Sequence, residues 1–306
     1  MSRESDFIAA LRPLATDPAA RGLRDDTAVM EIGGRTLVLT HDMIVEGVHF
    51  LATDPPADVA WKLLAVNLSD LAAKGAEPVG ALLGYALGQK DWDAAFLDGL
   101  RDVLAAFAVP LLGGDTVAAP SGAARTFSLT ALGTAEVAPS RSGAAEGDGL
   151  YVTGTIGDAG AGLEIAAGRR DGPAELLQAY RRPWPRLEEG RRLAPHVHAM
   201  MDISDGLLID ASRMAGASGL AVVIDLGLIP LSDALARFAG DDREARLRAA
   251  QAGDDYELLF AAPALPDGVA ATCIGRFVAG AGLSLEDAAG PVPLPPRLGY
   301  EHGETR

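Results

Sequence analysis

Two patterns of apolar and polar positions alternate along the chain: short runs rich in branched residues, and longer stretches with helical spacing. The run at 35–42 predicts a buried strand, and residues 61–76 predict a helix because Leu64, Leu68 and Leu71 follow the helical period. Further strands are expected at 80–87, 109–115, 125–135, 150–155, 219–226, 256–262 and 271–278, and further helices at 91–108, at 188–194 and after 204–207. Strands mixed with helices in this way predict an α/β (α+β) fold.

One segment near the middle of the chain differs from its surroundings. Residues 136–149 are polar and rich in Pro, Gly and Ser, which is typical of a connection between domains. We therefore expect an N-terminal domain over 1–138 and a C-terminal domain over 139–306.

Charge and length narrow the class of protein. The chain has 306 residues, 26 basic against 42 acidic, and a formal net charge of -16. This length supports an ample core, while the charge repels nucleic acid and anionic lipid. The first residues lack the pattern of a signal peptide, and no apolar run is long enough to span a membrane. We expect a cytoplasmic protein with no nucleic-acid and no membrane partner.

The single cysteine and the absence of familiar phosphate-binding motifs argue against further classes of protein. Cys273 cannot form an internal disulfide, and its apolar surroundings predict that it lies in the core. The sequence contains no GxxxxGK[ST] and no GxGxxG following a strand. The standard nucleotide-binding folds are therefore poor candidates.

Aspartates recur at the ends of apolar strands or in turns beside glycine: Asp25, Asp26, Asp42, Asp115, Asp202, Asp205, Asp254 and Asp255. Each one alone is ordinary turn or helix-capping chemistry. Asp70 differs, because it shares one narrow polar stripe with Asn67 and Lys74 on a helix that is otherwise apolar nearly all round. Together these carboxylates predict a site for hard divalent cations such as Mg²⁺, which would let an acidic protein bind phosphates.

Eight strings extend this pattern over nearly the whole chain: RDDTAV (24–29), THDMIVEGVHF (40–50), AVNLSDLAAKGAEP (65–78), GGDT (113–116), RSGAAEGDGLYVTGTIGD (141–158), RPWPR (182–186), MDISDGLLID (201–210) and GDDYELLF (253–260). With them the chain resembles the thiamine-monophosphate kinase family, in the superfamily of aminoimidazole ribonucleotide synthetase and selenophosphate synthetase. The resemblance implies a two-domain aminoimidazole ribonucleotide synthetase-like fold. It also implies a homodimer in which the N-terminal sheet pairs with its twofold mate.

The activity that this resemblance implies is transfer of the γ-phosphoryl group of ATP, the co-substrate, to thiamine monophosphate, giving thiamine diphosphate. Donor and acceptor are both polyanions, so several Mg²⁺ ions that bridge their oxygens are the direct remedy for the repulsion. The attacking phosphate oxygen is already ionised near neutral pH, so we name no catalytic base and expect direct transfer without a phospho-enzyme.

The resemblance also implies roles for particular residues. The metal ligands would be Asp26, Thr40, His41, Asp42, Asp70, Asp115, Asp202 and Asp205. The ATP-binding residues would be Gly114, Asp115, Arg141 and Ser204, and the residues holding thiamine monophosphate His49, Asp254 and Tyr300. Two positions depart from the family pattern: Arg24 stands where the family commonly has glycine, and His41 where it commonly has a small hydroxyl residue.

Other functions remain open on the sequence. The nearest is another ATP-using member of the superfamily, similar to aminoimidazole ribonucleotide synthetase. The relatives that use a reactive cysteine near either chain end are disfavoured, because the only thiol here is at position 273. A non-catalytic metal or nucleotide sensor is the alternative from a different class, and the loss of a metal aspartate would have favoured it.

Overall fold

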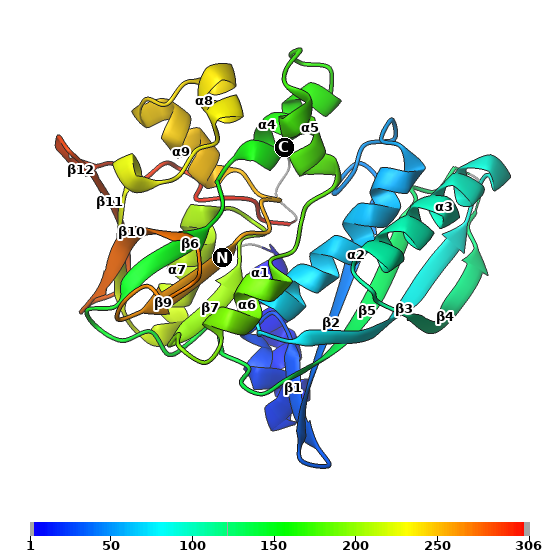
Figure 1. Cartoon of the computed structure of the whole chain (residues 1–306), viewed down its shortest axis with the longest axis horizontal. Coiled ribbons are helices and arrows are strands. Elements are labelled where there is room, and N and C mark those ends of the chain that lie inside the picture. The colour runs from blue at the N-terminus through cyan, green and yellow to red at the C-terminus, as the bar shows by residue number, and fades with distance from the viewer. Residues whose placement is uncertain (1–2, 121, 303–306) are drawn as a thin grey trace.

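The computed structural model describes residues 3–120 and 122–302, which fold into two α/β halves (Figure 1). The elements of the first half are α1 (Arg3–Leu11), η1 (Arg12–Leu14), η2 (Pro18–Leu23), β1 (Ala28–Ile32), β2 (Arg35–Val45), α2 (Pro56–Ala72), β3 (Glu77–Leu87), α3 (Lys90–Ala106), β4 (Leu111–Ala118) and β5 (Thr126–Ala135). Its strands form one sheet in the order β1-β2-β5-β3-β4.

The second half begins at β6 (Gly149–Thr153) and continues with α4 (Asp158–Ala166), α5 (Ala174–Arg181), α6 (Leu187–Leu193), β7 (Ala199–Asp202), α7 (Leu207–Ser218), β8 (Ala221–Asp225), η3 (Leu226–Leu228), α8 (Asp233–Ala239), α9 (Arg243–Gln251), β9 (Leu258–Ala262), β10 (Ala271–Val278), β11 (Gly282–Asp287) and β12 (Gly290–Val292). These strands form a second sheet in the order β12-β11-β8-β10-β6-β9-β7. The predicted α/β class is confirmed.

The first sheet has two very different faces. Helices α2 and α3 cover one face, where Phe96 and Phe127 are fully buried between sheet and helices (Figure 1). Among the described residues no helix covers the other face, and Met43, Leu82, Leu112 and Val117 on it are each at least 40% exposed. An apolar sheet face of this kind is unusual in a monomer and indicates a contact surface.

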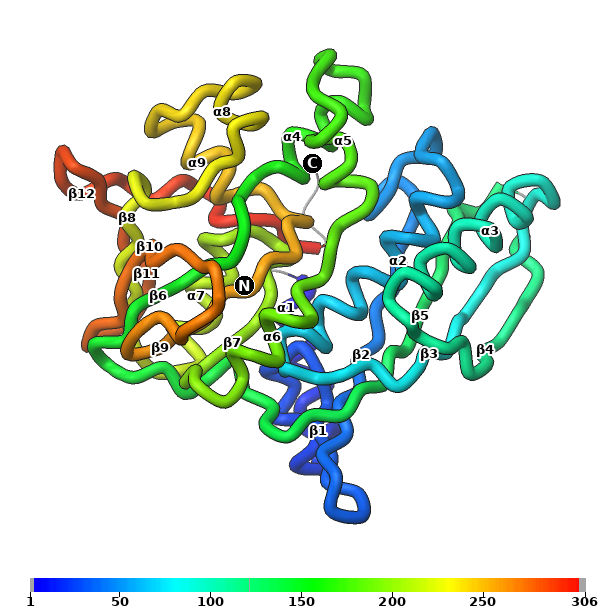
Figure 2. Tube along the Cα trace, in the orientation of Figure 1, coloured from blue at the N-terminus to red at the C-terminus, as the bar shows by residue number. Residues whose placement is uncertain are grey.

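Helix α2 lies between the two sheets, as the chain trace shows (Figure 2). Pro56 occupies its first turn, where a missing N–H is tolerated, and 13 of its 17 residues are buried. It packs against α6 so closely that a side chain at Gly190 would collide with the carbonyl oxygen of Ala72. A side chain at Gly75 would collide with Ala194, and its φ of +60° also favours glycine. The two halves are therefore joined backbone to backbone along α2 and α6.

The second half has its own core, which the strands share with α7. Val152, Leu259 and Ile274 of the sheet and Leu208 and Met214 of the helix are fully buried in it. In the described part of the chain, no helix combines the length and the apolar character that crossing a bilayer requires.

The predicted strands and helices are present, with shifted ends. The helix expected at 61–76 spans Pro56–Ala72, and the strand expected at 35–42 continues to Val45. The short or polar elements α1, β1, α5, β7, α8, α9, β11 and β12 had no prediction.

The prediction for Cys273 was wrong. The thiol is exposed, because the strand alternation of β10 turns Ile274 into the core and Cys273 outward. A register shift between Cys273 and Gly275 then brings Phe277 to the core side as well.

Candidate active site

A cavity of about 480 Å³ lies between the two halves. The first half contributes β2, the loop after it and α2, and the second half contributes α4 and the segments around residues 204 and 254. Residues near both chain ends, Glu4 and His302, complete the wall. Nine of the residues expected to bind metal, ATP or substrate line this cavity: Asp26, Asp42, His49, Asp70, Asp202, Ser204, Asp205, Asp254 and Tyr300.

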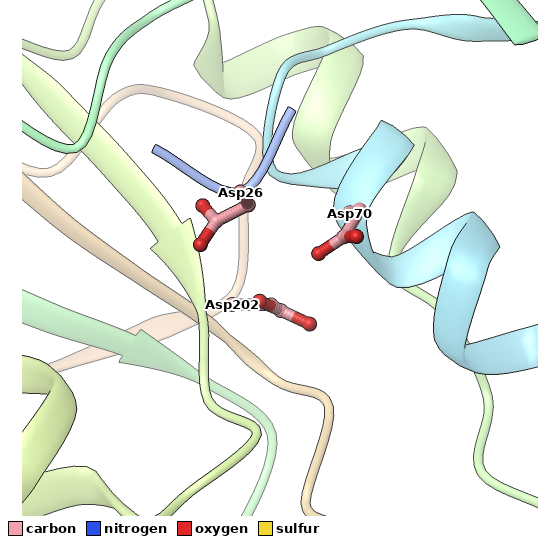
Figure 3. A group of neighbouring side chains, drawn as sticks. All are labelled: Asp26, Asp70 and Asp202. Carbon is pink, nitrogen blue, oxygen red and sulfur yellow. The ribbon is translucent and has the colours of Figure 1, made fainter. Parts of the chain in front are cut away.

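Three carboxylates meet at one end of the cavity (Figure 3). Oxygens of Asp26, Asp70 and Asp202 all lie within 4.8 Å of one another. Asp26 comes from the loop before β1, Asp70 from the last turn of α2 and Asp202 from the end of β7. Three unconnected elements thus aim like charges at one point, an arrangement suited to a cation with oxygen ligands.

Burial and mutual repulsion disfavour the ionised form of several carboxyls here. Burial, with the charges of Asp42 and Asp202, raises the pKa of Asp70 well above its ordinary value. Burial and the charge of Asp26 raise the pKa of Asp202 to about 8 and that of Asp42 to about 6. In the described chain none of these three carboxyls has an ion-pair partner among the basic residues. A bound cation would supply the missing positive charge.

Asp26 has basic partners of its own. Burial would raise its pKa, but the charges of Arg141 and Lys74 outweigh burial and hold the pKa below its usual range. Fully buried Lys74 places its Nζ 3.0 Å from Asp26 Oδ2 and 2.6 Å from Asp25 Oδ1, and donates to the Met200 carbonyl. The guanidinium of Arg141 donates to the other oxygen of Asp26. Lys74 of the predicted polar stripe therefore belongs to an ion-pair network that forms without a ligand.

The alternation of β2 separates its three candidate metal residues. The Thr40 hydroxyl donates to Asp70, and the Asp42 N–H donates to Asn67 Oδ1 over 3.1 Å, so both residues face α2. His41 lies between them and points to the opposite face of the sheet, where its Nδ1 is 2.8 Å from Thr130 Oγ1. The His41 side chain therefore cannot reach the three carboxylates of its own chain.

Gly114 and Asp115 also lie away from the cavity. They are on β4, an edge strand in which every residue is exposed, and Asp115 is paired with Gly84 of β3. Strands β5 and β3 separate β4 from β2. Within one chain the structure does not bring Asp115 together with Asp26, Asp70 or Asp202.

Two motifs of the second half are bound to each other beside the cavity. The Asp254 and Tyr256 N–H groups donate to the Ser204 and Ile203 carbonyls, each over 2.8 Å. Arg213 forms ion pairs with Asp205 and with buried Asp210. The segment at 203–205 and the segment at 253–257 therefore form one rigid unit.

The cavity wall also carries the residues expected to bind the substrate, His49, Asp254 and Tyr300. His49 is 5.4 Å from His302, ring centre to ring centre, and His302 is 4.8 Å from Tyr300. Burial and the charge of His302 lower the pKa of His49. The two residues Lys62 and His302 had no sequence prediction, because only the fold brings α2 and the chain end to this place.

Comparison with known proteins agrees with this architecture. The AIR synthase related protein N-terminal domain matches residues 24–135, and the C-terminal domain of the same description matches residues 145–286. The thiamine-monophosphate kinase of Caulobacter vibrioides is 42% identical, with 98% of this chain and 91% of that protein covered. The enzyme of that name from Salmonella typhimurium is 39% identical, with 93% of this chain and 92% of that protein covered.

Solved structures show the same relationship. The structure of AaThiL complexed with AMPPCP and TMP superposes with a TM-score of 0.87 at 30% identity, covering 98% of this chain and 97% of that one. The hydrogenase maturation protein HypE in complex with ATP has a TM-score of 0.70 at 19% identity, a likeness of fold alone. The matched domains, the curated relatives and the shared two-domain fold together place this chain in the thiamine-monophosphate kinase family.

Proposed function

We propose that the protein transfers the γ-phosphoryl group of ATP to the phosphate of thiamine monophosphate, giving thiamine diphosphate and ADP. The observation that carries the proposal is the meeting of Asp26, Asp70 and Asp202 at one end of a cavity large enough for small phosphate esters. The relatives with the highest identities quoted above are named for this reaction.

The donor set fits Mg²⁺. The three carboxyls that converge here offer oxygen atoms, which hard divalent cations prefer, and the raised pKa of Asp70 and Asp202 reflects burial and mutual repulsion. We propose that Asp26, Asp42, Asp70 and Asp202 hold several Mg²⁺ ions, with Thr40 and Asp205 beside them. When bound, these ions would offset the charge of the phosphates and of the transferred group.

The residues of the chain would then position the two substrates. The attacking oxygen belongs to a phosphate monoester that is ionised near neutral pH, so the transfer is proposed to be direct, without a general base and without a phospho-enzyme. Arg141 is proposed to hold ATP phosphate, with Ser204 nearby. In the described structure its buried Nε has no hydrogen-bond partner, which leaves an N–H available to a phosphate oxygen.

We further propose that the protein is a homodimer that joins two copies of the first sheet through their exposed apolar faces. Asp115 lies on that side of the sheet and is exposed, so in such a dimer Asp115 and Gly114 would reach the ATP site of the other copy. His41 shares this face and would lie in the dimer contact.

Mixing two inactive variants tests this assignment of Asp115. If Asp115→Asn and Asp202→Asn each abolish activity, a mixture refolded together should recover about a quarter of wild-type activity, because half of the dimers are mixed and each has one intact site. An Asp115 that acts within its own chain predicts no recovery at all.

The domain limits 1–138 and 139–306 and a cytoplasmic location remain proposals. All five strands of the first sheet precede residue 136 and all strands of the second follow residue 148, which supports the proposed division.

One assay tests the proposed reaction. The purified protein is incubated with ATP, Mg²⁺ and thiamine monophosphate, and thiamine diphosphate and ADP are measured by chromatography. Free thiamine in place of the monophosphate is the control and should yield no product. A folded protein that binds ATP but forms no thiamine diphosphate would support the sensor instead of the kinase.

A further inference from the structure

We propose that Lys62 is a positioning residue for the acceptor end of the cavity. It fixes His49 of the first half and Asp254 of the second half in one geometry. The proposal rests on the proposed function, because it takes thiamine monophosphate as the ligand of that end.

The contacts of Lys62 join the two halves at a single ammonium group. Its Nζ donates to Asp254 Oδ2 over 2.8 Å and to the His49 carbonyl oxygen over 2.9 Å. The residue is 2% exposed, so water does not compete for these bonds. A buried, charge-assisted bond of this kind fixes the position of both partners.

The third direction of the ammonium is also occupied. Nζ lies 4.2 Å from the centre of the Tyr180 ring, and the Tyr180 hydroxyl donates to Asp54 over 3.0 Å. An ammonium has three N–H donors, so two oxygens and one aromatic face satisfy it. Lys62 lies outside the wall of the 480 Å³ cavity. It is therefore placed to hold the residues of the site rather than to bind the ligand itself.

Asp254 has a backbone that needs support. Its φ of +69° and the φ of +51° at Tyr256 lie in the left-handed region, which residues other than glycine seldom adopt. The Tyr256 hydroxyl donates to Asp254 Oδ1 over 3.1 Å, while Lys62 holds Oδ2. Each oxygen thus has one fixed partner and keeps acceptor capacity toward the cavity.

This arrangement gives Lys62 a specific effect on the acceptor. A fixed Asp254 carboxylate presents negative charge to the cationic ring of thiamine monophosphate. Without Lys62 only the Tyr256 hydroxyl would restrain this carboxylate, so it could turn away more easily. ATP is proposed to bind at the carboxylates Asp26, Asp70 and Asp202, none of which is bonded to Lys62. Loss of Lys62 should weaken the binding of thiamine monophosphate and leave ATP binding unchanged.

The test replaces Lys62 by the neutral, similarly long methionine. For Lys62→Met we expect the KM for thiamine monophosphate to rise by about 10- to 100-fold, while the KM for ATP changes by less than about threefold. Calorimetric binding of thiamine monophosphate without ATP should weaken by a similar factor. In a double-mutant cycle, Lys62→Met should add less than about threefold to the effect of Asp254→Asn.

Asp58→Asn is the matched control. Asp58 also lies on α2 and forms an ion pair with Arg182 of the second half, but it does not line the 480 Å³ cavity. Its loss should leave both KM values unchanged. Two results would overturn the proposal: an equal rise in both KM values of Lys62→Met, or a selective rise in the KM for thiamine monophosphate in Asp58→Asn. Either result would mean that any loss of a contact between the two halves has this effect.

Two failures remain distinguishable. A wild-type protein that neither binds nor phosphorylates thiamine monophosphate refutes the proposed function, and the role of Lys62 falls with it. A wild-type protein that is active, with a folded Lys62→Met variant of normal KM, refutes the role of Lys62 alone. If Lys62→Met does not fold, Lys62→Gln gives the same comparison.

Discussion

Two groups of carboxylates lie in or beside the wall of the cavity and differ in whether a basic side chain of the protein neutralises them. Asp25, Asp26 and Asp254 each have a basic partner supplied by the chain, either Lys74 or Lys62. The carboxyls of Asp70 and Asp202 accept from the Thr40 and Ser69 hydroxyls, and neither they nor the Asp42 carboxyl has a basic partner in the described structure. Asp26 belongs to both settings, because it is paired with Lys74 and Arg141 and also converges with Asp70 and Asp202. The other three proposed metal ligands, Asp42, Asp70 and Asp202, depend on a ligand for their positive charge.

The first prediction removes one of the carboxylates without a basic partner. Asp70→Asn should lower kcat on the order of 1,000-fold or more, because a proposed metal ligand is lost. The metal-free variant should be more stable than wild type by about 1 kcal/mol, since repulsion among buried carboxylates is relieved. Steady-state kinetics and urea unfolding in EDTA measure the two effects. Asp98→Asn, at an exposed position of α3, is the control and should change neither.

The second prediction removes a cation from the other group. Lys74→Met should destabilise the protein by about 3 kcal/mol, because Asp25 and Asp26 remain buried without their shared partner. Urea unfolding measures the loss, with Lys90→Met on the exposed start of α3 as the control. The two substitutions should change the free energy of unfolding in opposite directions. Asp70→Asn should stabilise the metal-free protein, and Lys74→Met should destabilise it. Equal signs for Asp70→Asn and Lys74→Met would contradict the comparison.

The third prediction uses pH. The pKa of Asp202 is about 8 in the folded protein and roughly 4 in an unfolded chain, so the folded state binds more protons between these values. Stability of the metal-free protein should therefore fall as pH rises, by about 2 kcal/mol between pH 6 and pH 8. Urea unfolding in EDTA at both pH values measures it. Burial also raises the pKa of Asp70 and of Asp42, so Asp202→Asn should lose only its own share of this dependence, and an unchanged slope in that variant would assign the dependence to those two carboxyls.

The smallest expected effect is a count of protons. At pH 7 the carboxyl of Asp202 is mostly protonated in the metal-free protein, because its pKa is about 8. A bound Mg²⁺ requires the carboxylate, so binding should release at least about one proton, and more if Asp70, whose pKa is also raised, ionises with it. Calorimetric titration in buffers of different ionisation enthalpy counts the released protons. Metal binding with no proton release would mean that Asp202 is already ionised.

Sequence periodicity was sufficient to predict the helices and strands with a strong apolar pattern and to single out the carboxylates beside them. The fold class and the positions of β2, α2, α3 and β10 could be predicted, because each has a clear strand or helix period. Short, polar elements such as α8 and α9 have no such period. Asp26, Asp70 and Asp202 could be picked out one by one, since each sits at the end of an apolar run or on a polar stripe.

What the sequence could not provide is which residues face one another. His41 and Asp42 are adjacent in the sequence but lie on opposite faces of β2. Asp115 has the same glycine-flanked context as other candidates, yet the strand order places it at a far edge. Lys62 has no motif of its own, because its partners are 13 and 192 positions away. These facts depend on long-range packing, which a single sequence does not display.

The contact of α2 with α6 bears on how ligands enter and leave. With Gly190 against the Ala72 carbonyl and Gly75 against Ala194, the two halves are in backbone contact at this seam, which opposes sliding of one half along the other. We therefore expect such sliding to contribute little to the exclusion of water during turnover. Access should instead depend on thin, peripheral parts of the wall: the loop at 46–51, helix α1, which has no buried residue, and the last turn of chain at Tyr300 and His302. The rate of product release would then be set by loop motion around a stationary reaction centre.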